Sequence, residues 1–408
     1  MKPLHIIIVS IVVVVGGVSC RNHANELLNP NTAPYNTPLE QFEVVWNGIN
    51  NGYAFWDIDP TDWDSVYTVY KPRFEELSNQ ASVPTATLQN YYADMCSRLI
   101  DHHMAVVIRN PKPAADDTIT TFVINPGNSE VRTRPYYHER FSDSLLLVCI
   151  DKLRSAALVD TMAYCNTPQG SILACNINGI AYLHLSKFML TEALNNNDSS
   201  SQAIANAYRL FYDLAVHADT LKGIILDQRG NAGGYVNDFD YVLAPFIDKP
   251  LTLGTTRRKE GLARYDYSVW IPFTIEPAAE HRVPDVPIVA LADINSASMS
   301  ELTTYAVTLL PNGCFVGERT YGAHGPLFSN FEINYSGTFG DKNLQKTLHY
   351  VYMSNDVFKP NDGNILEGKG FRPNHQVLFN SEKMNAGDDV QLNAAIDIIL
   401  NNKFPTNP

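Results

Sequence analysis

The alternation of apolar and amphipathic segments is the feature of this sequence that most restricts its fold. From residue 176 onwards, short apolar runs alternate with longer segments of helical periodicity. The predicted strands cover 179–185, 223–227, 288–292 and 314–317, and the predicted helices cover 201–217, 238–247, the residues after 298, and 390–400. Such alternation is typical of an α/β domain.

Two of the predicted strands run directly into sharp polar turns. The strand at 223–227 leads into a turn with a Gly-Gly pair, and the strand at 288–292 leads into a turn that reaches Ser298 just before a helix. A hydroxyl at such a junction lies near helix N–H groups, which favour a developing negative charge. If both turns meet at the carboxyl end of one sheet, Ser298 is a candidate nucleophile. Alternatively, Ser298 and Glu301 form only a capping box, and the glycines only open a tight turn.

Four motifs in one order resemble the C-terminal processing (tail-specific) serine protease family and its tricorn-like relatives. Residues 223–234 are similar to L-D-x-R-x-N-x-G-G, 296–301 to S-A-S-x-S-E, 316–322 to V-G-E-x-T-x-G, and 366–374 to E-x-x-G-[IV]-x-P-D. The resemblance covers roughly residues 176–380. It implies a crotonase-like α/β serine protease domain that acts through an acyl-enzyme, with Ser298 as the nucleophile.

The general base is the point at which this chain departs from the tail-specific pattern. That branch has a lysine after T-x-G, whereas this chain has Ala323 there, so a Ser/Lys dyad is not expected. His103 ends a segment that resembles the D-G-H-x element of tricorn-like and lipoprotein relatives. The resemblance implies that His103 is the base and Glu367 the orienting acid, and an imidazole suits proton transfer near neutral pH. A lone histidine is more often a packing residue, and His102 and His324 remain alternatives.

Acyl transfer also requires hydrogen-bond donors for the oxyanion. Main-chain N–H groups at glycine-rich turns can serve, because no side chain blocks their approach. We expect the N–H of Met299 and that of Gly233 or Gly234 to do so. Arg229 and Asn231 are expected to brace the loop.

The amino terminus has the layout of a secretory signal peptide. An apolar run at 6–15 is followed by small residues and Cys20, in an order that resembles a bacterial lipoprotein cleavage box. We therefore expect residues 1–20 to be a signal peptide, Cys20 to be lipidated, and residues 21–37 to tether the protein to a membrane of the cell envelope. Plain secretion and an uncleaved anchor are the alternatives.

Three domains are expected after this tether. Residues 38–103 show helical periodicity, residues 104–175 read as a β-rich or mixed segment, and residues 176–408 form the catalytic domain. No peptide-binding PDZ domain is recognisable in the middle segment. Specificity for a free C-terminal carboxylate is therefore not expected.

The composition limits which binding partners and cofactors are expected for this protein. The net charge is −13, from 30 basic and 43 acidic residues, and there is no Lys/Arg-rich run, so nucleic-acid binding is not expected. No nucleotide or zinc motif is present, so no cofactor or metal is expected. The expected partner is a peptide or unfolded protein substrate. Of the five cysteines besides Cys20, Cys165 and Cys175 are close enough in sequence to form a disulfide.

Two other functions compete with peptide hydrolysis. Retinoid-binding relatives share this scaffold, so a non-catalytic ligand- or peptide-binding protein is the main alternative, and the missing lysine is compatible with it. Acyl-CoA chemistry of the crotonase type is a third possibility, which export from the cell disfavours.

Overall fold

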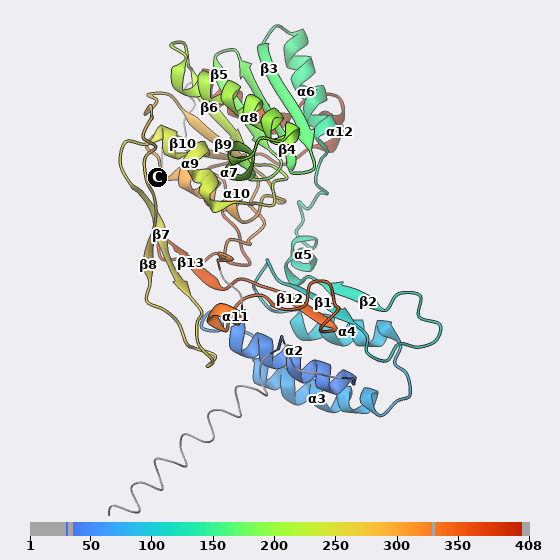
Figure 1. Cartoon of the computed structure of the whole chain (residues 1–408). Helices are drawn as coiled ribbons and strands as arrows, with labels where there is room; N and C mark the ends of the chain where they lie inside the picture. Colours follow the sequence, from blue (N-terminus) through green and yellow to red (C-terminus); the bar gives the residue numbers. More distant parts are fainter. Residues whose placement is uncertain (1–29, 32–35, 329–330, 402–408) are drawn as a thin grey trace, which may run out of the picture. The chain divides into compact units, whose positions relative to one another are not determined.

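The computed structural model describes residues 30–31, 36–328 and 331–401 (Figure 1). The predicted signal peptide, Cys20 and most of the predicted tether lie outside these ranges. Unit 1 contains residues up to 126, 258–269 and 327–357, and unit 2 contains 127–257, 270–326 and the residues from 358 onwards. This division differs from the predicted domain boundaries, because two later segments return to unit 1. In the described part of the chain, no helix has the length and apolar character needed to cross a bilayer.

In its described residues, unit 1 combines four helices with a four-stranded antiparallel sheet. Its elements are α2 (Pro38–Gly52), α3 (Trp63–Ser78), α4 (Thr85–Cys96), β1 (Ala105–Arg109), β2 (Thr121–Ile124), α11 (Phe331–Asn334), β11 (Phe339–Gly340) and β12 (His349–Tyr352), and the strand order is β11-β12-β1-β2. Asp62 caps α3 by accepting the Ser65 N–H at 3.0 Å. Gln41 fastens α2 to the sheet by donating to Arg109 O and Leu348 O. The predicted N-terminal helices are therefore confirmed.

Unit 2 is built on a seven-stranded sheet of order β14-β10-β9-β6-β5-β4-β3. The strands are β3 (Val159–Thr167), β4 (Gly170–Ile177), β5 (Ile180–Leu185), β6 (Gly223–Asp227), β9 (Ile288–Ala292), β10 (Gly313–Gly317) and β14 (His375–Gln376). Strands β5, β6, β9, β10 and β14 are parallel, and β3 and β4 are antiparallel. The strands at 104–175 thus divide between the units, with β1 and β2 in unit 1 and β3 and β4 in unit 2.

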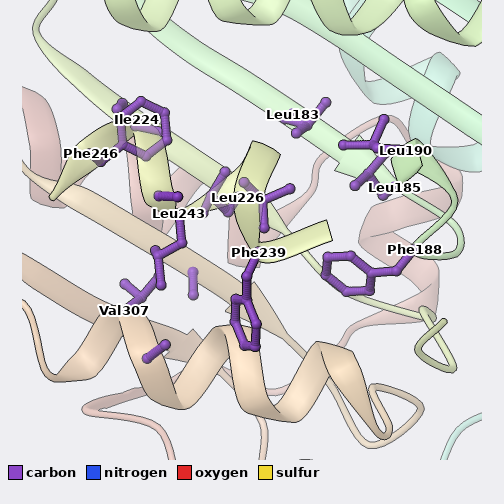
Figure 2. Close-up of a cluster of buried hydrophobic side chains, with 14 of the residues drawn as sticks. Leu183, Leu185, Phe188, Leu190, Ile224, Leu226, Phe239, Leu243, Phe246 and Val307 are labelled. Atoms are coloured by element: carbon purple, nitrogen blue, oxygen red, sulfur yellow. The ribbon is translucent and has the colours of Figure 1, made fainter. Parts of the chain in front are cut away.

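Helices cover both faces of this sheet. The helical elements of unit 2 are α5 (Pro126–Val131, at the unit boundary), α6 (Asp143–Ser155), α7 (Leu190–Asn195), α8 (Ser199–Tyr212), the π-turn Asp213–His217, α9 (Phe239–Val242), α10 (Met299–Thr308), α12 (Ser381–Asn385) and α13 (Val390–Leu400). Alternate residues of each central strand point into different cores. One core contains Leu226 of β6 with side chains of α8 and α10, and the other contains Ile225 with side chains of α6 and α13. Figure 2 shows part of the first core, with Leu226, Phe239 and Val307 of α10 among its side chains. Burial on both faces explains the uninterrupted apolar runs of β6 and β9.

The predicted helix at 238–247 is wrong. The structure has two 3₁₀ turns, Val236–Asp238 and Ala244–Phe246, on either side of the four-residue α9. Pro245 has no N–H to donate to a helical carbonyl, and its ring clashes with the carbonyl four residues earlier, so it disfavours a continuous helix at this point. A further sheet has the order β13-β7-β8, from β7 (Leu251–Arg258), β8 (Ile271–Ile275) and β13 (Asp356–Pro360).

The suggested disulfide between Cys165 and Cys175 is also wrong. The two residues lie on the paired strands β3 and β4, where Cys165 faces Ile172 and Cys175 faces Met162. Cys175 is buried in one core, whereas Cys165 packs against the other, so the two thiols point to opposite faces of the sheet. All five described cysteines are free.

Candidate active site

Three polar turns follow neighbouring strands at one edge of the seven-stranded sheet. We call them the glycine turn (residues 228–234, after β6), the serine turn (293–298, after β9) and the threonine turn (318–324, after β10). The carboxyl ends of parallel strands meet at the same edge, so these turns are neighbours. The Gln228 N–H donates to Leu291 O at 2.7 Å, and the Glu318 N–H donates to Ala292 O at 2.9 Å.

The glycine and serine turns are in direct contact, as the sequence predicted. The carbonyl oxygen of Asn231 accepts the Ala297 N–H at 3.0 Å and the Ser300 hydroxyl at 2.7 Å. A Cβ atom placed on Gly233 would lie 2.5 Å from the Cβ of Ser298. Only a glycine lets the two turns approach this closely.

Ser298 has a backbone conformation that is rare outside glycine. Its φ is 59° and its ψ is −123°, and it directly precedes α10. Residues held in such conformations cost on the order of 1–3 kcal/mol each and cluster at functional sites. Among the described residues, no acceptor binds the N–H of Met299 or that of Gly234, whereas the Gly233 N–H donates to Asn231 Oδ1 at 2.8 Å. Two donors therefore remain available beside the hydroxyl.

Glu301 forms the capping box considered as the alternative and also binds the threonine turn. Within the box, its Oε2 accepts the Ser298 N–H at 3.3 Å. The same fully buried carboxylate accepts the Thr320 hydroxyl at 2.5 Å, the Gly322 N–H at 2.9 Å and the Ala323 N–H at 2.7 Å. Burial raises the pKa of Glu301, although His324 and Thr320 oppose that rise. Capping and a functional serine are thus compatible here.

A histidine and a carboxylate form a buried pair next to the serine turn. Ala323, at the position of the family lysine, accepts the Ser298 N–H through its carbonyl oxygen at 2.6 Å. The following residue, His324, donates from Nδ1 to Glu367 Oε2 at 2.8 Å, and its main-chain N–H donates to the same atom at 3.1 Å. Burial lowers the pKa of His324, with Glu301 acting in the opposite direction. Within unit 2, Glu367 therefore orients His324.

Comparison with known proteins agrees with this arrangement. Residues 179–377, which contain all three turns and Glu367, match the model of peptidase family S41. Residues 179–377 are a domain of peptidase family S41. This S41 peptidase is accordingly a serine-type enzyme.

Solved structures show the same fold. A peptidase from Parabacteroides merdae aligns over 90% of this chain and 98% of its own, with 20% identity and a TM-score of 0.61. Mature CPAF aligns over 91% of this chain and 99% of its own, with 11% identity and a TM-score of 0.56. No curated protein sequence matches the chain.

The predicted base of this S41 peptidase, His103, belongs to unit 1 and is held there by two partners. The fully buried Asp101 accepts the His103 N–H at 2.9 Å, the Ser354 N–H at 2.7 Å and the Ser354 hydroxyl at 3.0 Å. Because the single hydroxyl proton of Ser354 goes to Asp101, the Ser354 oxygen accepts a hydrogen bond from the Nδ1–H of His103, at 3.3 Å. This fixes the neutral ring as the Nδ1–H tautomer, in which Nε2 is basic. The rival His102 is buried beside it.

Arg229 and Asn231 brace the glycine turn, as expected from the sequence. The fully buried Arg229 pairs with Asp227 at 2.6 Å and with Asp389 at 2.8 Å. Burial alone would raise the pKa of Asp227, but the charge of Arg229 outweighs it and holds that pKa well below its usual range. Asn231 Nδ2 donates to Leu185 O at 2.8 Å.

Several residues of this site escaped the sequence reasoning. Asp101 lies two residues from His103 and could have been suspected from that spacing alone. Ser354 is 251 residues from His103 and gives no local signal. The same is true of His138, which contacts Glu318 across 180 residues. Within either unit by itself, the described residues hold no group of three His, Cys, Asp or Glu side chains close enough to share a metal ion.

Proposed function

We propose that this S41 peptidase hydrolyses peptide bonds of peptides or unfolded proteins through an acyl-enzyme on Ser298. The observation that carries the proposal is the conformation of Ser298, at φ 59° directly before α10 and against the glycine turn. A sharp, strained turn before a helix is how serine hydrolases expose a nucleophilic hydroxyl.

In the proposed reaction, Ser298 Oγ attacks the scissile carbonyl carbon and its proton passes to an imidazole. A C–O bond forms, and the Met299 and Gly234 N–H groups stabilise the oxyanion, each worth roughly 3–4 kcal/mol in kcat. When the intermediate collapses, the C–N bond breaks and the imidazolium protonates the departing amine. Water then hydrolyses the ester by the same steps in reverse. Gly233 takes no part as a donor, because Asn231 already occupies its N–H.

We assign His103 as the base. The family resemblance implies Glu367 as the orienting acid, but Nδ1 of His103 binds Ser354 and Glu367 binds His324 within unit 2. Support for His103 comes from unit 1, where Asp101 and Ser354 fix its Nδ1–H tautomer. The assignment requires that Nε2 of His103 reach Ser298 during catalysis. His324 is the rival base, because Glu367 orients it at 2.8 Å in the unit that also carries Ser298.

Four purified proteins test this function. Wild type is compared with Ser298→Ala, His103→Ala and His324→Ala in hydrolysis of an unfolded protein substrate, with circular dichroism to confirm folding. Ser298→Ala abolishes hydrolysis, and His103→Ala lowers kcat by about 10²–10⁴-fold. Unchanged hydrolysis by Ser298→Ala refutes the proposal. If His324→Ala loses hydrolysis and His103→Ala keeps it, His324 and not His103 is the base.

The proposed location is the bacterial cell envelope, with a lipid anchor at Cys20. Support comes from the sequence alone, through the apolar run at 6–15 and the small residues before Cys20. Metabolic labelling with a radioactive fatty acid should label the wild-type protein and leave Cys20→Ser unlabelled. Equal labelling of both proteins contradicts the anchor.

A non-catalytic ligand- or peptide-binding protein is the second candidate. Ala323 in place of the family lysine is the observation that favours it. This candidate predicts a folded protein with no hydrolysis in any of the four preparations.

A further inference from the structure

A histidine that the proposed reaction does not use lies between two of the turns at the site. His138 precedes α6, and its Nε2 is 2.9 Å from Glu318 Oε2 and 4.0 Å from Asp293 Oδ2. Its ring stacks on Phe379, with centroids 4.2 Å apart. The side chain is only 12% exposed, and both carboxylates are buried.

Both ring nitrogens of His138 face acceptors. Nδ1 lies 2.9 Å from the carbonyl oxygen of Glu139, and Nε2 lies against the carboxylate of Glu318. A neutral imidazole has one N–H and can satisfy only one of these oxygens. With both carboxylates ionised, the geometry therefore fits the imidazolium cation, which donates from both nitrogens.

Asp293 fastens the serine turn to the glycine turn. Its Oδ1 accepts the Gly230 N–H at 2.9 Å, the Asn295 N–H at 3.0 Å and the Ser296 hydroxyl at 3.1 Å. The Asn295 amide in turn donates to the carbonyl oxygen of His138 at 3.2 Å. A change in the charge around Asp293 therefore acts on the turn that ends in Ser298.

Glu318 of the threonine turn also binds the serine turn. Its Oε1 accepts the Phe379 N–H at 2.7 Å, and its Oε2 accepts the Ile294 N–H of the serine turn at 3.4 Å. Asp293 and Glu318 are thus two buried anions that hold one turn and share one histidine.

The other charged groups nearby are already paired. Arg229, which contributes to the potential at Asp293, binds Asp227 and Asp389. On the segment of His138 itself, Glu139 binds Arg132 at 3.0 Å at the surface.

Arg140, two residues after His138, lies against Gly230 and donates to Ser186 O. His138 is therefore the group whose charge can balance the two carboxylates. Burial would lower the pKa of His138, but Glu318 and Asp293 outweigh it and raise that pKa above 6.5. Burial raises the pKa of Asp293, and the charge of His138 opposes this rise.

We propose that protonated His138 is a positioning residue for the nucleophile. By binding Glu318 and Asp293 together, it keeps the serine turn in place on the glycine turn. When His138 loses its proton, the turn loosens and peptide hydrolysis slows. This inference rests on the proposed role of Ser298.

The direction of the pH effect follows from the raised pKa. A histidine whose pKa is higher in the folded protein contributes stability that is complete below its unfolded pKa of about 6.5. That contribution disappears as the pH rises through the folded pKa. Activity therefore falls on the alkaline side because of His138, whereas protonation of the catalytic base lowers it on the acid side.

The test measures kcat and KM against pH for wild type, His138→Gln and His138→Lys. Wild-type kcat declines on the alkaline side while KM changes little. His138→Gln lowers kcat on the order of 10- to 100-fold at pH 6.5 and removes the alkaline decline. His138→Lys keeps a cation and restores kcat without that decline. A wild-type profile in His138→Gln overturns the inference.

A second measurement covers the case in which His138→Gln does not fold. In an NMR titration of the wild-type protein, the His138 imidazole titrates above pH 6.5, and its pKa falls in Glu318→Gln. Titration at or below 6.5 in wild type overturns the inference. If Ser298→Ala hydrolyses peptides as wild type does, the proposed function fails. If Ser298 is essential but His138→Gln has the wild-type profile, only the present inference fails.

Discussion

The contact between the glycine and serine turns predicts a large effect for Gly233→Ala. A new Cβ would lie 2.5 Å from Ser298 Cβ and 3.0 Å from Met299 N, whereas carbon atoms normally stay about 3.5–4.0 Å apart. The serine turn must therefore move by roughly 1 Å, which is enough to lower kcat/KM on the order of 10²-fold. The φ of +98° adds backbone strain of about 1–3 kcal/mol, and overpacking adds a similar amount. We expect a total loss of about 2–6 kcal/mol in the free energy of unfolding.

Gly363→Ala is the matched control. Gly363 also has a positive φ, +81°, but no atom lies within 4 Å of a Cβ placed there. It should therefore show the strain alone, about 1–3 kcal/mol, with unchanged kcat/KM. Urea denaturation gives the free energies, and hydrolysis of an unfolded protein gives the rates. If Gly233→Ala hydrolyses the substrate as fast as Gly363→Ala, the close approach of the two turns plays no part in activity.

Three further predictions concern residues away from this contact. Ser354→Ala should lower kcat about 10-fold without raising KM, because His103 loses the partner that fixes its tautomer. Ser354→Thr keeps the hydroxyl and should restore kcat. Equal kcat in wild type and both variants speaks against the role of Ser354. Arg229→Met should lower the free energy of unfolding, measured with urea, by about 3–5 kcal/mol, because it leaves two carboxylates buried without their cation. The variant also raises the pKa of Asp227, and the ionised Asp227 contributes stability only above that pKa, so acid unfolding should begin at a higher pH than in wild type. An acid-unfolding midpoint equal to that of wild type contradicts this. Cys165 and Cys175 should both be alkylated by iodoacetamide in unfolded, unreduced protein. If mass spectrometry finds neither of them alkylated before reduction, they form a disulfide and the prediction is wrong.

The elements that could be predicted from the sequence are those whose own residues determine them. Strands β6 and β9 and helix α13 lie where predicted, because each is bounded by turn or capping residues and has a clear apolar pattern. The region 238–247 has an apolar pattern as well, but Pro245 interrupts its hydrogen bonding. The unit boundaries could not be found, because segments 258–269 and 327–357 join unit 1 through contacts distant in sequence.

The candidate site divides in the same way. The motifs identified both turns that meet at Ser298, because each turn is a continuous stretch of sequence. The pairing of Glu367 with His324 and the contact of Ser354 with His103 span 43 and 251 residues, so no local pattern indicates them. They arise from strand order and from the return of later segments, which the sequence does not display.

Covalent labelling tests the central claim most directly, namely that Ser298 is an activated nucleophile. Wild type, Ser298→Ala and His103→Ala are incubated with a fluorophosphonate at neutral pH, and intact-mass and peptide mass spectrometry follow the adduct. We predict one adduct per chain on Ser298 in wild type, none in Ser298→Ala, and a strongly slowed reaction in His103→Ala. A folded wild-type protein that gains no adduct, or gains it at another residue, contradicts the account.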